Sequence, residues 1–466
     1  MAGAGGLVSR PSWLPRVGVV LAAGRSERMS SLTGGGSKAL LRLGGLTLVE
    51  RAVKSLLAAG IESVVVVVGH NAGPVAALVD GLAPGRVRTA YAERWQDGNG
   101  ASLATVEGLV AGEKLFVLLT ADHLFGDGAV DRLLEAGTPA VLVDPSPGTA
   151  WEEGTKVRVV DGAVVAFGKA LDEPGIDCGA FLLPPDIFRC RAEVALEGDD
   201  TLAGAVTRLA QESPLQVVAL PVGCWWQDVD TPEDAQAAAA ALRGSLGKAA
   251  DGPVSRWLNR PVSTRLSMLL ARLRPDPDVV SVVAFLLGLA GAVLLATGEG
   301  VAGALLVHAS SVADGVDGEV ARLQMRGRPQ GALLDGVLDR VGDAAILAGL
   351  GLWAVEAHDP RVVLVLTVAA TAGALLSMAT KDRAAALGLP PAPERALGWL
   401  LGGRDGRLFL VAVGALFGSP MVALAAVTAT SAISLALRVA FLRRTSLTGS
   451  SGGVTEPTSE APVPSE

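Results

Sequence analysis

The chain has 466 residues, enough for two or three domains, and 50% of them are hydrophobic. Its mean hydropathy is positive, which is high for an ordinary soluble protein, so we expect part of the chain to lie in a bilayer. The formal net charge is -8, and the basic residues stand in short clusters beside apolar segments, which excludes the usual pattern of a nucleic-acid partner. The 3 cysteines show no CxxC spacing and leave one unpaired, so we expect a reducing, cytosolic environment and no zinc site.

From Arg16 to about Arg243, short β-branched runs alternate with Ala/Leu-rich helical stretches. The runs that read as buried strands are VGVVLAAG, SVVVVVGH, LFVLLTAD and AVLVD. This alternation predicts a Rossmann-like α/β domain over residues 16–243, with a parallel sheet covered by helices on both faces. The first residues, MAGAGGLVSRPSW, do not resemble a cleavable signal peptide, so we expect the domain to stay in the cytoplasm.

A glycine-rich turn, LAAGRSERM, follows the first predicted strand and leads to SKAL. Such a turn offers backbone N–H groups to phosphates, here around Gly24, and Arg28 and Lys38 can neutralise a triphosphate. The small-residue loop GNGASL, which contains Asn99, can admit a nucleotide base. These features predict a nucleotide site at one edge of the sheet.

Acidic residues stand at the carboxyl ends of later strands. Asp122 lies in TADH, and Asp228 and Asp230 lie in WWQDVDTPED. An open α/β sheet binds its ligand at this edge, so the acids are expected to face the nucleotide site.

Together these motifs resemble the nucleotidyltransferase family that makes nucleotide sugars, with its L-x-x-G-x-G-x-R-M…PK signature, over about residues 16–240. Ser26 stands where the second glycine usually falls, and Ser37 where proline usually precedes the lysine. The resemblance implies that a sugar phosphate attacks the α-phosphorus of a nucleoside triphosphate and expels pyrophosphate. The residues that it assigns are the Mg²⁺ (or Mn²⁺) ligands Asp122 with Asp228 or Asp230, the phosphate contacts Lys38 and Arg28, and the sugar-phosphate contacts Lys156, Lys169 and Asp177. For the lysines, a solvated surface charge is an equally open interpretation.

Residues 244–278 form the junction between domains, where spaced arginines and an apolar stripe predict an amphipathic helix at the membrane surface. Beyond it, six apolar segments predict an all-α, six-helix transmembrane domain over 279–443. Basic residues gather in alternate loops, which by the positive-inside rule places both termini and the basic loops in the cytoplasm of a multi-pass protein of the cell membrane. The tail, 444–466, is rich in Ser, Thr, Pro, Gly and Glu and is predicted to be disordered.

Four aspartates stand at helical spacing in DGVDGEVARLQMRGRPQGALLDGVLD: Asp314, Asp317, Asp335 and Asp339. Each pair projects from one face of its helix, so the four carboxylates are expected to converge. Clustered acids near a bilayer need cations, and an all-oxygen site suits Mg²⁺ or Mn²⁺. Gly318 and Gly331 would let a pyrophosphate approach the backbone, and Arg322 can bind its oxygens. The alternative is that the aspartates only pair with Arg322 and Arg340.

This stretch matches the CDP-alcohol phosphotransferase signature D-x2-D-G-x2-A-R-x8-G-x3-D-x3-D without a gap. The resemblance covers about residues 250–443 and implies that the four aspartates bind metal and that Asp339 is the general base. Three further cytoplasmic cations could hold an acceptor phosphate, although topology alone would also place them there: Arg383, Arg404 and Arg407.

The fusion itself resembles the bifunctional family that joins an inositol-1-phosphate cytidylyltransferase to a di-myo-inositol phosphate phosphate synthase. The implied partners are CTP, inositol 1-phosphate, CDP-inositol and the lipid bilayer, and homodimerisation stays open. One alternative is a phospholipid synthase that uses CDP-diacylglycerol. Two others are a regulatory protein whose N-terminal domain only senses nucleotide, and a transporter, although the polar residues cluster towards one side of the helices instead of the midplane.

Overall fold

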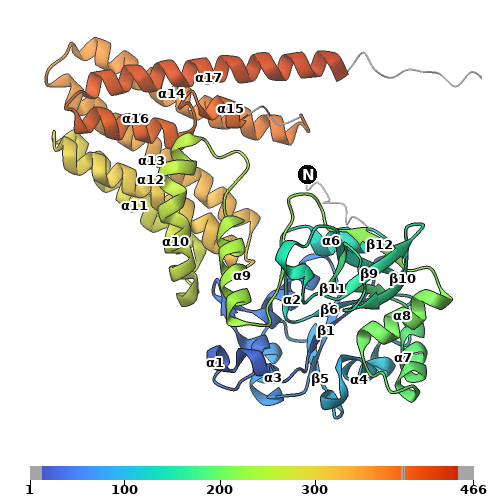
Figure 1. Cartoon of the computed structure of the whole chain (residues 1–466). Helices are drawn as coiled ribbons and strands as arrows, with labels where there is room; N and C mark the ends of the chain where they lie inside the picture. Colours follow the sequence, from blue (N-terminus) through green and yellow to red (C-terminus); the bar gives the residue numbers. More distant parts are fainter. Residues whose placement is uncertain (1–12, 390–391, 393, 450–466) are drawn as a thin grey trace, which may run out of the picture. The chain divides into compact units, whose positions relative to one another are not determined.

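The computed structural model describes residues 13–389, 392 and 394–449. The predicted absence of a signal peptide and most of the predicted disordered tail fall on residues 1–12 and 450–466, outside this range. The described chain divides into two compact units. The first holds the residues up to Ser245 with Leu323–Met325, and the second holds Leu246–Arg322 and the residues from Arg326 on. Figure 1 draws the first as a sheet flanked by helices and the second as a bundle of helices.

A nine-stranded sheet forms the centre of the first unit, in the order β5-β4-β1-β6-β11-β8-β12-β10-β9. Its strands are β1 Val17–Ala22, β4 Ser63–Val68, β5 Val87–Tyr91, β6 Phe116–Thr120, β8 Ala140–Asp144, β9 Lys156–Val160, β10 Ala163–Gly168, β11 Ile176–Leu183 and β12 Gln216–Ala219. Two short pairs lie beside it, β2 Arg42–Leu43 with β3 Leu46–Thr47 and β7 His123–Phe125 with β13 Trp226–Asp228.

The four predicted strands are β1, β4, β6 and β8, but the prediction of a parallel sheet is only partly correct, because the second half of the sheet is mixed and only β8 and β12 pair in parallel there. β1 pairs in parallel with β4 and β6, whereas β11 runs antiparallel between β6 and β8. β9 and β10 are antiparallel because Asp161 and Gly162 join them in a two-residue turn with positive φ at both positions. Such a turn makes a hairpin, not the crossover that a parallel pair requires.

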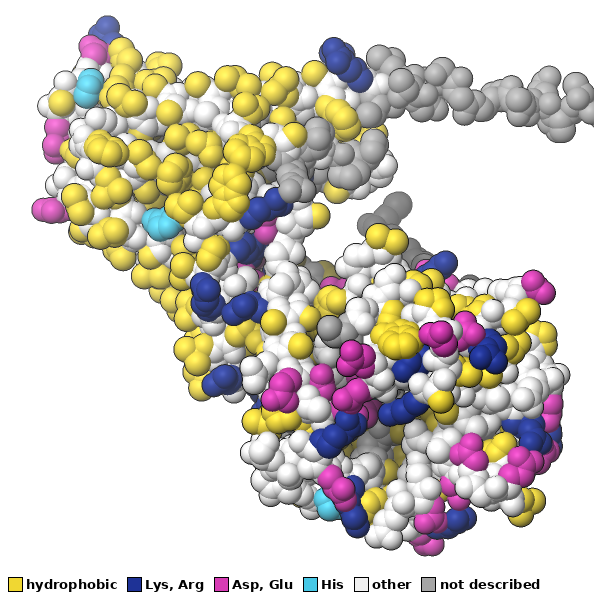
Figure 2. Space-filling model, viewed as in Figure 1, with side chains coloured by type: hydrophobic (Ala, Val, Ile, Leu, Met, Phe, Trp, Pro, Cys, Tyr) yellow, Lys and Arg dark blue, Asp and Glu magenta, His cyan; other side chains and the backbone are white. Residues whose placement is uncertain are grey.

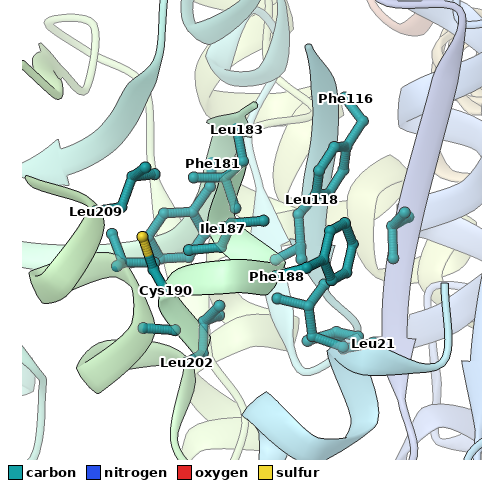
Figure 3. Packing of buried hydrophobic residues seen from close by; sticks show 14 of the residues in the cluster. Leu21, Phe116, Leu118, Phe181, Leu183, Ile187, Phe188, Cys190, Leu202 and Leu209 are labelled. Atoms are coloured by element: carbon teal, nitrogen blue, oxygen red, sulfur yellow. The ribbon is translucent and has the colours of Figure 1, made fainter. Parts of the chain in front are cut away.

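Helices cover both faces of this sheet, as predicted. One face packs against α7 Asp186–Leu196 and α8 Leu202–Glu212, the other against α2 Leu48–Ala58, α3 Ala72–Asp80 and α6 Ala129–Leu134. Figure 3 shows the first of these layers, where Cys190 of α7 and Leu209 of α8 lie beside Phe181 of the sheet, and Phe188 of α7 lies beside Phe116 and Leu118. The remaining helices of the unit are α1 Ser30–Thr33, α4 Asn99–Ala104, α5 Glu107–Val110 and α9 Pro232–Gly244.

The second unit is helical throughout. Its helices are α10 Arg260–Leu270, α11 Pro277–Ala296, α12 Gly300–Leu323, α13 Pro329–Val355, α14 Pro360–Ala386, α15 Glu394–Gly398, α16 Arg404–Leu416 and α17 Pro420–Gly449. α17 therefore continues past the predicted end at residue 443, because RRTSLTG contains no residue that stops a helix before its glycine. At Gly349 of α13, a Cβ would lie 2.2 Å from the carbonyl oxygen of Ala292 in α11, so only glycine permits this close helix packing.

The six predicted apolar segments all lie in helices, namely α11, α12, α13, α14, α16 and α17. Three of these are long and apolar enough to cross a membrane: α11, α14 and residues Pro420–Arg444 of α17. The count of six spans is not confirmed, since acids lower the hydropathy of α12 and α13 and α16 has only 13 residues. Figure 2 shows hydrophobic side chains spread over the outer surface of this unit, and exposed examples include Leu286, Leu364 and Val422.

Helix α10 and the turn before it bury their polar side. Trp257, Val262 and Leu269 are exposed, whereas Ser263 and Ser267 are fully buried. The buried serines donate hydrogen bonds to Glu319 of α12, over 2.7 Å and 2.6 Å, and Arg260 pairs with the same carboxylate. The predicted amphipathic helix is thus attached to the bundle through polar contacts, and its apolar side faces outwards.

Candidate active sites

The glycine-rich turn after β1 has the backbone conformation that its signature requires, in spite of the serine. Ser26 has a φ of 60°, in the left-handed region that glycine normally fills. Its hydroxyl accepts a hydrogen bond from the backbone N–H of Lys38 over 2.9 Å. Ser26 therefore connects the two halves of the motif, and the position of Lys38 depends on it.

Lys38 lies between two of the predicted acids. Its ammonium is 2.7 Å from Asp122 and also pairs with Asp230. Arg28 pairs with Asp230 as well and contacts Glu153 at 2.7 Å. Burial opposes a charged lysine, but the two carboxylates outweigh it and raise the pKa of Lys38. The phosphate-binding cations of the prediction are thus held in place by the acids around them.

Asp122, His123 and Asp228 form a second group around the same site, with one ligand atom from each within 4.8 Å of the others. Burial raises the pKa of Asp228 to about 6. Burial would also raise the pKa of Asp122, but the charges of Lys38 and His123 lower it below its usual value. Of the two acids left open by the sequence, Asp228 belongs to the group that could hold a metal ion, and Asp230 pairs with the cations.

A cavity of about 230 Å³ opens at the carboxyl end of β1, lined by Gly24, Lys38, Asn99 and Asp122 among others. Asn99 lies at its rim, where its side-chain oxygen accepts a hydrogen bond from the backbone N–H of Leu202 over 2.8 Å. The loop predicted to admit a base and the turn predicted to bind phosphates therefore line one cavity.

The predicted sugar-phosphate contacts separate into different environments. Lys156 is 3% exposed, and its ammonium lies 4.5 Å from the centre of the Trp151 ring. Lys169 is exposed. Asp177 accepts a hydrogen bond from the N–H of Gly179 over 2.7 Å, and burial raises its pKa to about 6. Lys156 is thus not the solvated charge of the alternative interpretation.

In the helical unit, Asp314, Asp335 and Asp339 bring one carboxylate oxygen each within 4.8 Å of the others. The cation among them is Arg404 of α16, which is 2.6 Å from Asp314 and 3.1 Å from Asp339. Arg340 pairs instead with Asp382. Three of the four aspartates converge as predicted, and Arg340 is not their partner.

The fourth motif aspartate, Asp317, lies beside the group. Its side chain is 6% exposed and accepts hydrogen bonds from Ser281 and from the N–H of Gly318. Asp317 and Gly318 line the same cavity of about 380 Å³ as the other three aspartates. All four carboxylates thus border one space, although one is already hydrogen-bonded.

The other predicted contacts differ in their access to this cavity. Arg404 and Arg407 line it, but Arg407 is 2% exposed and its guanidinium is bound to Asp343 at 2.9 Å. Arg383 is exposed at the end of α14. Gly331 lies near Asp278, and Arg322 donates to the carbonyl of Leu246 over 2.8 Å.

The sequence interpretation missed several residues that the structure brings to these sites. His123 could have been noticed, because it directly follows a strand-end aspartate. Lys248, Ser377, Lys381 and Arg438 line the cavity of the helical unit, but they are scattered along 191 positions of sequence without a shared spacing. Only the packing of the helices reveals that group.

Comparison with known proteins gives a match for each unit. Residues 18–175 match the MobA-like NTP transferase domain, and residues 276–402 match the CDP-alcohol phosphatidyltransferase family. A "Bifunctional IPC transferase and DIPP synthase" from Rubrobacter xylanophilus is 38% identical, covering 91% of this chain and 96% of the relative. One of the same name from Aquifex aeolicus is 33% identical over 86% of this chain and 92% of the relative.

Two further matches cover one unit each. A phosphatidylinositol phosphate synthase from Streptomyces avermitilis is 33% identical over 33% of this chain and 63% of its own length. The solved inositol-1-phosphate CTP transferase from T. maritima covers 47% of this chain and 91% of its own, at 23% identity and a TM-score of 0.43. The full-length relatives, which span both units, decide the assignment: the chain belongs to the family of bifunctional IPC transferases and DIPP synthases.

Proposed function

We propose that the chain makes CDP-inositol from CTP and inositol 1-phosphate, and then transfers its phospho-inositol group to a second inositol 1-phosphate. The products would be pyrophosphate, CMP and di-myo-inositol phosphate phosphate, the precursor of a compatible solute. The observation that carries this proposal is the 38% identity to a bifunctional relative over 91% of the chain. The two carboxylate groups, one in each unit, are consistent with two separate reactions.

In the first reaction, a phosphate oxygen of inositol 1-phosphate would attack the α-phosphorus of CTP, and pyrophosphate would leave. Asp122 and Asp228 are the proposed ligands of Mg²⁺ or Mn²⁺, and Gly24 and Asn99 line the nucleotide cavity. Lys38 and Arg28 would bind phosphate oxygens and stabilise the charge that develops on them. Lys156 and Asp177, with Lys169, are the proposed contacts of the sugar phosphate.

In the second reaction, a hydroxyl of inositol 1-phosphate would attack the inositol-bearing phosphorus of CDP-inositol, and CMP would leave. The proposed metal ligands are Asp314, Asp317, Asp335 and Asp339; bound divalent ions would neutralise the pyrophosphate. Asp339 would accept the proton of the attacking hydroxyl. Arg404 lies among these carboxylates and could bind a phosphate, whereas Arg407 would position the site through Asp343.

The finer layout belongs to the same proposal. We infer a cytidylyltransferase domain over 16–243, a junction over 244–278 and a phosphotransferase domain over 279–443. The six apolar helices would cross the cell membrane, with both termini and both active sites on the cytoplasmic side, because the basic loops all lie on one side of that topology.

A phospholipid synthase that uses CDP-diacylglycerol is the second candidate, because 153 residues of the chain are 33% identical to a phosphatidylinositol phosphate synthase and residues 276–402 match the CDP-alcohol phosphatidyltransferase family. One assay separates the two. Detergent-purified protein receives Mg²⁺ and inositol 1-phosphate with either CTP or CDP-diacylglycerol, and phosphorus NMR identifies the products. Pyrophosphate, CMP and a phosphodiester in the CTP arm support the proposal. A phospholipid product in the other arm alone would overturn it.

A further inference from the structure

His123 is placed beside Asp228 by the backbone itself. It begins β7 directly after Asp122, and the antiparallel register of β7 with β13 sets His123 opposite Asp228. Residues directly opposite in such a pair have Cβ atoms only about 4.5–5.5 Å apart. The imidazole therefore has one carboxylate as its neighbour in sequence and another across the strand pair.

Three electron-pair donors meet at this point. The Nε2 atom of His123 is 3.9 Å from Oδ1 of Asp122 and 3.8 Å from Oδ1 of Asp228. Both oxygens are buried, and within the described part of the chain neither has a hydrogen-bond partner. Lys38 contacts the other oxygen of Asp122, Oδ2. A buried carboxylate oxygen without a partner is costly, which makes these two atoms candidates for a cation.

The orientation of the imidazole is fixed by its surroundings. The ring stacks on Trp226, with centroids 5.3 Å apart and planes 8° from parallel. The indole N–H of Trp226 donates to Asp144 over 2.7 Å. Gly179, with a φ of +70°, also borders the ring, since a Cβ there would be 2.9 Å from Cγ of His123. The ring thus occupies a fitted slot that fixes the direction of its nitrogen.

The spacing suits one ion. A nitrogen or oxygen ligand lies about 2.0–2.2 Å from a divalent transition metal, so two ligands of one ion are at most about 4.4 Å apart. Separations of 3.8 Å and 3.9 Å are within this limit. Asp230 has a different role in the structure, since it pairs with both Lys38 and Arg28.

We propose that His123 is the third protein ligand of the metal centre of the nucleotidyl-transfer site, together with Asp122 and Asp228. This inference rests on the proposed function, which places a divalent metal there. A nitrogen ligand favours Mn²⁺ or Co²⁺ over Mg²⁺, whereas the carboxylates of the helical unit provide oxygen alone. The two reactions of one chain therefore differ in their metal preference.

Pulsed EPR tests this on the full-length protein in detergent, loaded with Mn²⁺ and CTP and without inositol phosphate. The chain has 4 histidines, so a directly coordinated imidazole gives a ¹⁴N coupling that mutation can assign. We expect the coupling in the wild type and in the control His358→Gln, which changes a histidine of the helical unit. His123→Gln should remove it and weaken Mn²⁺ binding at this site at least about tenfold.

A second variant, His123→Glu, keeps the test decisive if His123→Gln fails to fold. Its carboxylate reaches a similar point, so Mn²⁺ should bind without ¹⁴N coupling, and the ratio of CDP-inositol formation in Mn²⁺ to that in Mg²⁺ should fall at least about tenfold. Coupling that survives in His123→Gln overturns the proposal. A second combination of results also overturns it: the wild type shows no ¹⁴N coupling, although Asp122→Asn lowers the number of bound Mn²⁺ ions by one. His123 would then be only an ion-pair partner of the carboxylates.

An Asp122→Asn variant that binds as much Mn²⁺ as the wild type would also overturn the inference. The proposed function is judged separately, by whether the wild type forms CDP-inositol from CTP and inositol 1-phosphate.

Discussion

The two carboxylate sites of this chain are assembled in different ways. In the helical unit, four aspartates within 26 residues lie on two consecutive helices, and helical periodicity places each pair on one face of its helix. In the α/β unit, Asp122 and Asp228 are far apart in sequence and meet because β7 pairs with β13. The first kind of site is encoded locally, and the second depends on strand pairing.

The largest expected effect is that of Asp339→Asn, which should inactivate the second reaction and leave the first one intact. We expect the second reaction to fall about 10³-fold or more, because the variant loses the proposed base and one metal ligand. CDP-inositol should then accumulate from CTP, as measured by phosphorus NMR. Glu356→Gln, an exposed carboxylate at the other end of the same helix, is the control. Equal loss of both reactions would contradict the independence of the sites.

Lys38→Met is the matching change in the α/β unit. We expect CDP-inositol formation to fall about 10²–10³-fold, since the variant loses a half-buried cation that is proposed to bind the phosphates. The second reaction should continue when CDP-inositol is supplied directly. Lys114→Met changes an exposed lysine of the same unit that has no proposed role and should have a much smaller effect. If supplied CDP-inositol is not consumed, Lys38 affects more than its own site.

Glu319→Ala tests how the helical unit supports its site. The change removes the acceptor of Ser263, Ser267 and Arg260 inside the protein, although Arg260 keeps Asp251. We expect a loss of about 2–4 kcal/mol in the stability of this unit. The temperature at which the second reaction is lost on heating measures this change in stability. Glu319→Gln should retain more than half of the stability that Glu319→Ala loses. Unchanged inactivation temperatures for Glu319→Ala would show that α10 is not held by this contact.

The smallest expected effect concerns Asp177 in the α/β unit. Its folded pKa of about 6 lies above the unfolded value of about 3.9, so the native state binds its proton more tightly. The free energy of unfolding therefore falls as the pH rises from about 4 to 6, and the full loss of stability is present above about pH 6. The Asp177→Asn variant should be more stable than the wild type by on the order of 1 kcal/mol at pH 7.5, and almost equally stable at pH 4. Hydrogen exchange of β11 peptides measures this, and an equal gain at both pH values would exclude the titration as its cause.

The contrast between the sites explains what the sequence could predict. The motif aspartates could be predicted because Asp314 and Asp317 are three residues apart and Asp335 and Asp339 four, each about one helical turn. The strands β1, β4, β6 and β8 could be predicted because buried strands are continuous apolar runs. The partners from elsewhere in the chain, Arg404 for the helical site and His123 opposite Asp228, depend on tertiary packing. β11 escaped prediction because IDCGAFLL combines a site motif with a strand.

Arg404 gives the acidic cluster of the helical unit a counterion of its own. Three carboxylates crowded together would repel one another while the helices are inserting, before any ion has arrived. With a guanidinium already between them, the helices can dock in the absence of metal, and the proposed ions would bind after folding. A chelator should therefore inactivate the helical unit reversibly, without unfolding it.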